Sequence, residues 1–186
     1  MEKINNFLLV EPDWLGVEQF GVASIPVTIK DWLLEQGSLT LRMKNTFTGP
    51  FSVSVEGEGW SFPYKQDAEV LQIQTGEAFI REVVLNIGQI PYVFARTTIP
   101  RRSLDALQQL ATLGARPLGE VIFSYPELKR MCIDVVQISR KDLSLKGQSL
   151  LGAHDALWAR RNTYDINGHQ FIVSEFFLPS MFNNKC

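Results

Sequence analysis

Two stretches of the chain alternate apolar and polar side chains on either side of a turn. In residues 156–179, the dipeptide Asn167-Gly168 separates two runs rich in β-branched and aromatic residues. Asn-Gly favours a type I′ turn, which requires a positive φ at both central residues, so this stretch predicts a β-hairpin. Residues 78–99 predict a second hairpin, with its turn at residues 86–89.

Each predicted hairpin carries one charged residue on an otherwise apolar strand face. Side chains alternate with period 2, so Glu175 shares its face with Val173 and Phe177, and Arg81 shares its face with Phe79 and Val83. A buried charge is costly unless it is paired or neutralised. Glu175 therefore belongs to a structural ion pair, to a strand end that reaches solvent, or to a functional site. A buried structural pair of Arg81 with Glu175 is one alternative, and a shared ligand pocket is the other.

Helix signals lie between the strand-like runs. Pro26 and Gly37 predict the start and the end of a helix, and Ser38 is the expected N-cap of a short helix over residues 39–45. Ser103 is the expected cap of a further helix that ends at Gly114. Residues 116–120 contain a proline where another helix would begin.

The remaining segments complete an α+β pattern. Residues 51–56 and 131–138 predict strands, 57–65 a loop and 141–153 an exposed connection. We expect a single domain over residues 1–186, with one antiparallel β-sheet flanked by helices. Residues 1–24 form an N-terminal extension, in which four apolar residues are expected to pack on the core: Phe7, Leu8, Leu9 and Trp14.

Composition and charge narrow the functional classes. A net charge of −2 gives no electrostatic footprint for nucleic acid. No apolar segment is long enough for a signal peptide core or a membrane span, so we expect a cytoplasmic protein that does not bind membranes. Cys132 and Cys186 provide neither a disulfide framework nor metal-ligand spacing. The basic pairs Arg101-Arg102 and Arg160-Arg161, and also His154 and His169, are expected at the surface.

The sequence contains no phosphate-binding loop, dinucleotide fingerprint, paired metal-binding histidines or serine nucleophile elbow. This argues against metal-dependent, nucleotide-dependent and acyl-enzyme chemistry. What remains is an interior arginine and an interior glutamate. Arginine binds carboxylates through two parallel N–H···O bonds, and a shielded glutamate accepts a hydroxyl proton, so the two suit a small cyclic or aromatic carboxylic acid.

Five sequence blocks resemble the chorismate pyruvate-lyase family and occur in the family's order: DWLLEQGSLT (31–40), ARTTIP (95–100), LGARPLG (113–119), LWARR (157–161) and SEFFLP (174–179). The resemblance covers most of residues 26–179. It implies a lyase that cleaves chorismate to 4-hydroxybenzoate and pyruvate, supplying the aromatic precursor of ubiquinone, without a metal or organic cofactor. It also implies an antiparallel sheet with the ligand enclosed under helix-containing flaps.

The resemblance assigns roles to four residues. Arg81 matches the arginine that binds a carboxylate, Glu175 matches the carboxylate that meets the ring hydroxyl, and Leu39 and Leu118 match binding positions in the flaps. Catalysis would fall to Glu175 and Arg81. We expect a monomer that binds chorismate and is inhibited by its product. The alternative function is a non-catalytic binding domain for a small aromatic carboxylate, related to the ligand-sensing domains of bacterial regulators.

Overall fold

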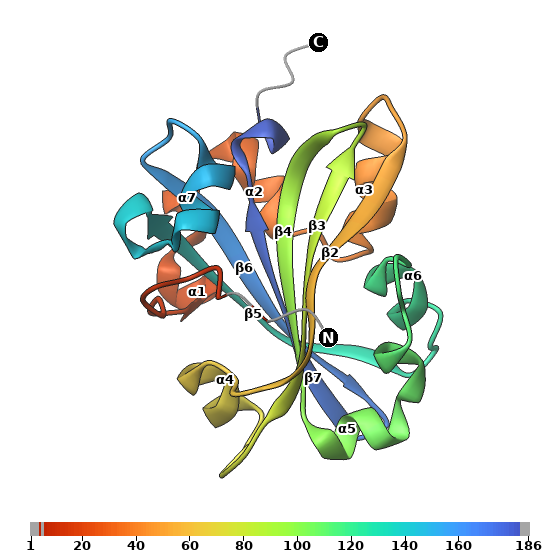
Figure 1. The fold of residues 1–186 in the computed structure, drawn as a ribbon. Helices are drawn as coiled ribbons and strands as arrows, with labels where there is room; N and C mark the ends of the chain where they lie inside the picture. Colours follow the sequence, from red (N-terminus) through yellow and green to blue (C-terminus); the bar gives the residue numbers. More distant parts are fainter. Residues whose placement is uncertain (1–3, 5, 183–186) are drawn as a thin grey trace.

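The computed structural model describes residue 4 and residues 6–182, and its centre is a twisted β-sheet (Figure 1). Every neighbouring strand pair is antiparallel, and the strand order is β1-β5-β6-β7-β4-β3-β2. The seven strands of this sheet are β1 (Leu15–Gly16), β2 (Phe51–Ser61), β3 (Ala78–Ile87), β4 (Ile90–Ile99), β5 (Leu128–Ser139), β6 (Ala156–Ile166) and β7 (His169–Phe177). The expected α+β fold with one antiparallel sheet is confirmed.

Short helices connect the strands. The α-helices of the described residues are α1 (Val17–Phe20), α2 (Val27–Leu33), α3 (Leu39–Thr46), α4 (Lys65–Val70), α5 (Arg101–Ala106), α6 (Leu118–Ile122) and α7 (Leu145–Leu151). Turns of 3₁₀-helix occupy Val22–Ser24, Gln108–Ala111, Arg140–Asp142 and Pro179–Met181. The predicted N-cap of α3 is confirmed, because the Ser38 hydroxyl accepts a hydrogen bond from the Leu41 N–H at 3.3 Å. The predicted start of α6 after Pro117 is confirmed as well.

Both predicted hairpins are present. Asn167 and Gly168 form the two-residue connection between β6 and β7, with φ values of 53° and 85°. These positive φ angles are those that a type I′ turn requires. The turn between β3 and β4 is tighter than expected, because Ile87 and Ile90 pair with each other.

Two local predictions are wrong. Residues 57–65 are not all loop, because β2 continues to Ser61, past a bulge after Val55, and its backbone pairs with β3 as far as Ala78. Ser103 is not a helix cap, since α5 begins at Arg101. Its buried hydroxyl instead donates to the Gln170 carbonyl at 2.8 Å and ties α5 to β7.

The segment 141–153 is not a wholly exposed connection. It contains α7, and Leu143 and Leu151 are buried in a cluster that covers the sheet. Phe7 and Leu8 join this cluster as expected, whereas Leu9 is 67% exposed. The segment is polar on average, but Leu143 just before α7 and Leu151 at its end pack against the apolar sheet face at either end of the helix.

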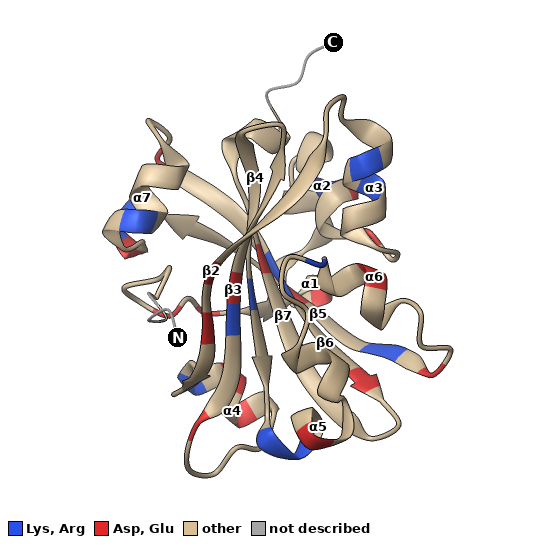
Figure 2. Cartoon of the chain, turned by 45° about the vertical axis from the view of Figure 1, so that its right-hand side comes forward, with Lys and Arg blue, Asp and Glu red and all other residues tan. Residues whose placement is uncertain are grey.

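Helices cover both faces of the sheet (Figures 1 and 2). On one face, called here the cavity face, lie α2, α3, α5 and α6; on the other lie α4, α7 and the segment around Phe7. The expectation that Arg160 and Arg161 are solvated is wrong, since they are 1% and 4% exposed. Strand alternation sends Arg160 to the cavity face and Arg161 to the opposite face. None of the helices in the described part of the chain is long and apolar enough to cross a bilayer.

Charged side chains are buried on the opposite face as ion pairs. Arg96 Nη1 donates to Glu82 Oε1 at 2.6 Å, and both residues are at most 1% exposed. Arg161 bonds to Asp134 at 2.7 Å and to Asp67 at 3.3 Å. Burial raises the pKa of the Glu82 carboxyl above its ordinary value, and the neighbouring Arg96 charge opposes that rise. Each charge on this face therefore depends on its partner.

Replacing Arg96 by Met should destabilise the fold strongly, because Glu82 would lose its partner in a fully buried position. We expect a loss of about 3–5 kcal/mol in the free energy of unfolding, measured by urea denaturation. The double variant Glu82→Leu/Arg96→Met should be more stable than the single variant, since it leaves no unpaired charge. Strictly additive losses would show that the two side chains do not interact energetically.

Candidate active site

A cavity lies on the cavity face, between the sheet and the first turns of α3 and α6. Its empty volume is about 540 Å³, counting the space at its mouth. Most of its lining residues are apolar, although nearly half of the surface that they expose to the cavity is polar. Strands β2, β3, β4, β6 and β7 all contribute. The lining residues are Gly37, Leu39, Thr40, Val53, Arg81, Val83, Leu85, Ala95, Thr97, Pro117, Leu118, Gly119, Ile122, Phe123, Arg160, Tyr164, Val173 and Glu175.

The structure brings all four sequence-predicted site residues to this one cavity. Arg81 and Glu175 reach it from β3 and β7, and Leu39 and Leu118 are the first residues of α3 and α6. The other candidate chemistry lies elsewhere: His154 and Cys132 are exposed, His169 lies just after the β6–β7 turn, and Cys186 lies outside the described residues. No group of three His, Cys, Asp or Glu side chains in the described part of the chain is placed to hold a metal ion.

Strand register fixes the distance between the two charged residues. Ala95 on β4 is the partner of both Val83 and Glu175, and Thr97 is the partner of both Arg81 and Val173. Arg81 and Glu175 are thus two strands and two residues apart, about 10 Å across the sheet and about 7 Å along it. They do not pair with each other; each has another partner. The alternative in which they form a mutual buried pair is wrong.

Arg81 is held by groups at the edge of the cavity. Its Nε donates to Glu58 Oε2 at 3.1 Å, and its Nη2 donates to the Gly114 carbonyl at 2.6 Å. Burial lowers the pKa of the guanidinium, which still stays protonated because arginine starts so high. Nη1 hydrogen-bonds to no described residue, so Arg81 retains donors for an anion in the cavity.

Glu175 uses one carboxylate oxygen and leaves the other open. Its Oε2 accepts from Arg160 Nε at 2.5 Å and from Asn162 Nδ2 at 3.1 Å. Its Oε1 has no hydrogen-bond donor among the described residues, and the side chain is 11% exposed. One oxygen therefore anchors the side chain while the other can accept a hydrogen bond from a ligand.

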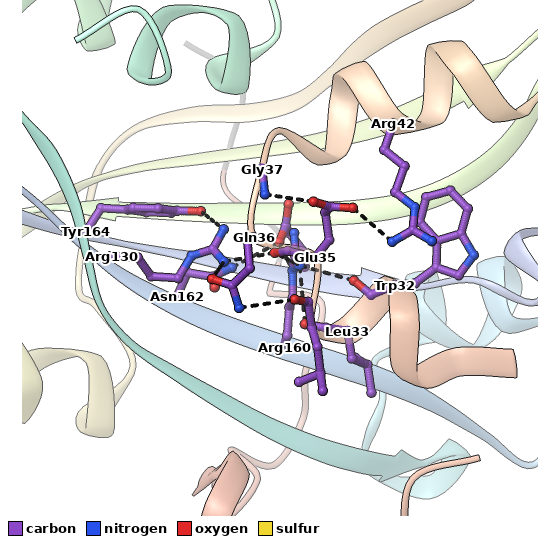
Figure 3. A network of polar contacts seen from close by, with 12 residues as sticks. Trp32, Leu33, Glu35, Gln36, Gly37, Arg42, Arg130, Arg160, Asn162 and Tyr164 are labelled. Atoms are coloured by element: carbon purple, nitrogen blue, oxygen red, sulfur yellow. Dashed lines mark hydrogen bonds and ion pairs between the residues drawn. The ribbon is translucent and has the colours of Figure 1, made fainter. Parts of the chain in front are cut away.

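Arg160 connects Glu175 to the end of helix α2, and Figure 3 shows Arg160 beside Trp32, Leu33 and Glu35. Its Nη1 lies within hydrogen-bond distance of the carbonyls of Trp32, Leu33 and Glu35, at 3.1, 3.2 and 3.1 Å. The last carbonyls of a helix lack intrahelical donors and carry partial negative charge, so a guanidinium there is doubly favoured. Arg160 was expected at the surface and was not predicted as a site residue. The signal was available, because Arg160 shares a strand face with Trp158, Asn162 and Tyr164.

A second set of hydrogen bonds holds the segment between α2 and α3 in place (Figure 3). The Glu35 carboxylate accepts from the Gly37 N–H at 2.7 Å and from Arg42 Nη1 at 2.9 Å. Arg130 donates to the Glu35 carbonyl at 2.8 Å and to the Tyr164 hydroxyl at 3.0 Å. Burial and the nearby Glu175 charge raise the pKa of Tyr164, which therefore stays a neutral phenol in the cavity wall.

The first turns of α3 and α6 meet beside the cavity. A Cβ added to Gly119 would lie 3.0 Å from Ser38 Oγ and 3.4 Å from Thr40 Oγ1, so the absence of a side chain permits this approach. An exposed ion pair, Lys44 Nζ to Glu120 Oε1 at 2.5 Å, also links the two helices. Surface pairs of this kind contribute little stability. The contact between the helices is therefore close but weakly held.

Solved structures with a similar fold are ligand-binding domains of transcriptional regulators. The effector domain of PhnF from Mycobacterium smegmatis superposes with a TM-score of 0.55 at 17% identity, covering 79% of this chain and 91% of that domain. The ligand-binding domain of a GntR-family regulator from Bordetella bronchiseptica gives 0.54 at 15% identity, covering 75% and 91%. At such identities the likeness concerns the fold alone.

Comparison of the sequence with known families identifies the family, which the fold likeness does not. Residues 9–186 match the family model described as chorismate lyase. A probable chorismate pyruvate-lyase of Pseudomonas syringae is 37% identical over 179 residues, covering 92% of this chain and 90% of that protein. Another, from Aromatoleum aromaticum, is 34% identical over 163 residues, covering 84% and 88%. This chain therefore belongs to the chorismate lyase family.

Proposed function

We propose that the cavity is the active site in which this chorismate lyase family member converts chorismate to 4-hydroxybenzoate and pyruvate. The observation that carries the proposal is the pair of Arg81 and Glu175, which have opposite charges, line one cavity among mainly apolar residues and each retain one uncommitted polar group. A ring with a carboxylate at one end and a hydroxyl at the other complements that arrangement.

In the proposed complex, Arg81 binds the ring carboxylate and Glu175 Oε1 accepts a hydrogen bond from the ring hydroxyl. Leu39 and Leu118 contribute from the first turns of α3 and α6, where backbone N–H groups have no intrahelical acceptor. The apolar wall excludes water, which strengthens both polar contacts. A single copy of the chain supplies a complete set of these residues, and we propose that the enzyme is a monomer.

The proposed chemistry is an elimination that makes the ring aromatic. The bond between the ring carbon and the ether oxygen breaks, and this oxygen becomes the ketone oxygen of pyruvate. The hydrogen on the neighbouring hydroxyl-bearing carbon moves to the enolpyruvyl methylene, which becomes the methyl group of pyruvate. If this transfer is direct and cyclic, the protein contributes orientation and a dry cavity, and these are worth several kcal/mol.

Glu175 has two alternative roles. In the cyclic transfer it only orients the ring hydroxyl. In a stepwise elimination it is the base that takes a proton from the substrate. We favour the first role, because the enolpyruvyl group already supplies an acceptor for the hydrogen.

The second candidate function is a non-catalytic binding domain for an aromatic carboxylate. It is favoured by the fold shared with ligand-binding domains of regulators. Incubation of the purified protein with chorismate distinguishes the two. A lyase releases 4-hydroxybenzoate and pyruvate in equal amounts, whereas a sensor domain binds an aromatic carboxylate and leaves chorismate unchanged.

Arg81→Ala should remove most of the activity, because the substrate carboxylate would enter a buried site without its counter-charge. We expect a loss of about 3–5 kcal/mol, roughly a hundredfold or more in kcat/KM. Arg81→Lys should recover part of it, since lysine keeps the charge but lacks the planar fork. Glu58→Gln is the matched control, because it removes the partly exposed partner of Arg81 and keeps the guanidinium; we expect a loss below about tenfold. Near-normal kcat/KM in Arg81→Ala would contradict the assignment.

Glu175→Gln separates the two roles of the carboxylate. If Glu175 only orients the hydroxyl, the amide oxygen stays on Arg160 and Asn162 and the amide NH2 can donate to the hydroxyl oxygen, so one hydrogen bond to the ligand remains and kcat should fall by about ten- to a hundredfold. If Glu175 is the base, the loss should approach roughly 10²–10⁴-fold and kcat should lose its dependence on the ionisation of a carboxylate. A pH profile of kcat for both proteins is the measurement.

The product should inhibit competitively and leave slowly. 4-Hydroxybenzoate keeps the ring carboxylate and the hydroxyl, the two groups proposed to meet Arg81 and Glu175, so it should bind at concentrations near KM or below. We propose that α3 and α6 act as flaps that must open before it leaves, a step that often limits turnover. Rapid-quench experiments should show a burst of product. Progress curves unaffected by excess 4-hydroxybenzoate would show that these retained groups do not dominate the affinity.

A further inference from the structure

Arg160 has hydrogen-bond donors that nothing in the described part of the chain uses. Its Nε is bonded to Glu175, and its Nη1 faces the three carbonyls at the end of α2. Its Nη2 has no acceptor among the described residues, although the side chain is only 1% exposed and lines the cavity. A buried guanidinium normally has its N–H groups satisfied, so an unused Nη2 beside a cavity indicates a place for an acceptor.

The cavity wall offers two guanidinium groups. Among the lining residues, Arg81 and Arg160 are cationic and Glu175 is anionic. Arg81 is paired with Glu58 and Arg160 with Glu175, yet each guanidinium keeps a donor that no described residue uses. A ligand with a single carboxylate uses one guanidinium. A ligand with two carboxylates uses both.

The geometry of the proposed substrate places its second carboxylate near Arg160. In chorismate, the enolpyruvyl arm is attached to the ring carbon next to the one that carries the hydroxyl. When the hydroxyl meets Glu175 Oε1, the arm begins one ring position away from that contact. Arg160 is the cation bonded to the other oxygen of the same carboxylate, at 2.5 Å. Arg81 lies two strands away from Glu175, where the opposite end of the ring would lie.

We propose that Arg160 Nη2 binds the carboxylate of the enolpyruvyl arm, so that Arg160 is a binding residue as well as the anchor of Glu175. This inference rests on the proposed function and adds a subsite to it. Its consequence is discrimination, because the arm carboxylate is the group that substrate has and 4-hydroxybenzoate lacks. Binding energy at Arg160 favours substrate over product, whereas binding energy at Arg81 and Glu175 does not.

A pair of stable aromatic ligands tests the subsite. 3-(Carboxymethoxy)-4-hydroxybenzoate carries a second carboxylate on an ether next to the hydroxyl, and 4-hydroxybenzoate has no such arm. The dissociation constants of both are measured by titration calorimetry for the wild-type protein, Arg160→Gln and Arg160→Lys. The quantity of interest is the ratio of the two constants within each protein. An effect that acts only through Glu175 changes both constants equally and leaves this ratio unchanged.

In Arg160→Gln the ratio should shift against the arm-bearing ligand by about tenfold or more, the value of a hydrogen bond to a charged group. Arg160→Lys should shift it less, because the positive charge remains. Arg161→Lys is the matched control: it changes the adjacent arginine on the opposite face, which lines no part of the cavity, and should leave the ratio at the wild-type value. Partial misfolding lowers the binding stoichiometry and not the ratio.

An unchanged ratio in both Arg160 variants would overturn the inference. So would an equal shift in Arg161→Lys, which would mean that the effect is not local to the cavity. Failure of the proposed function has a different signature, namely a wild-type protein that makes no 4-hydroxybenzoate from chorismate. If the wild-type enzyme is active but the ratio of the two dissociation constants is unchanged in the Arg160 variants, only the arm subsite is ruled out.

Discussion

The ion pair between Arg160 and Glu175 is the interaction on which the site depends. Removing a carboxylate from water is costly, and on the cavity face Glu175 accepts hydrogen bonds from one guanidinium and one amide. The guanidinium is itself fixed by carbonyls at the end of α2. A helix terminus that would otherwise need water thus positions the group proposed to meet the substrate hydroxyl. Loss of this helix end would therefore disturb the site from outside the cavity.

The sheet distributes its charges over both faces. Adjacent residues on one strand, such as Arg81 and Glu82 or Arg160 and Arg161, point in opposite directions, so each strand serves the cavity and the opposite core at once. On the opposite face, the charged side chains are paired within the protein, and the polar atoms of Glu82 and Arg96 that have no partner do not line the cavity. On the cavity face, Arg81, Glu175 and Arg160 each keep an uncommitted group and line the cavity. Access to the cavity is what separates the binding site from the structural network.

Much of the fold could be predicted from local sequence. The Asn167-Gly168 turn, the Ser38 cap and the alternation in the two hairpins depend on neighbouring residues, and these predictions were correct. The errors involve distant partners. Arg160 and Arg161 look like a surface pair because sequence does not show the carbonyls of α2 or the carboxylate of Asp134 that accept their hydrogen bonds. The helix in residues 145–151 was missed because its one buried leucine, Leu151, and Leu143 just before the helix are recognisable as core residues only once the sheet is known.

For the site, the alternation of side chains along the strands identified Arg81 and Glu175 as single charges on apolar strand faces. The family resemblance predicted Leu39 and Leu118 as binding positions. This alternation alone could not show that Arg81 and Glu175 do not pair with each other, because that depends on the register of β4 between them. It also could not reveal Glu58 and Arg160, which neutralise them from neighbouring strands. Each of the two charges therefore has a partner other than its counterpart across the cavity.

The central claim is that a ring ligand lies between Arg81 and Glu175 in one fixed direction. A crystal structure of the protein with 4-hydroxybenzoate tests it most directly. The account predicts electron density for the ligand in the cavity, with its carboxylate on Arg81 and its hydroxyl within hydrogen-bond distance of Glu175 Oε1. A ligand bound with its carboxylate toward Arg160, or bound outside this cavity, would contradict it.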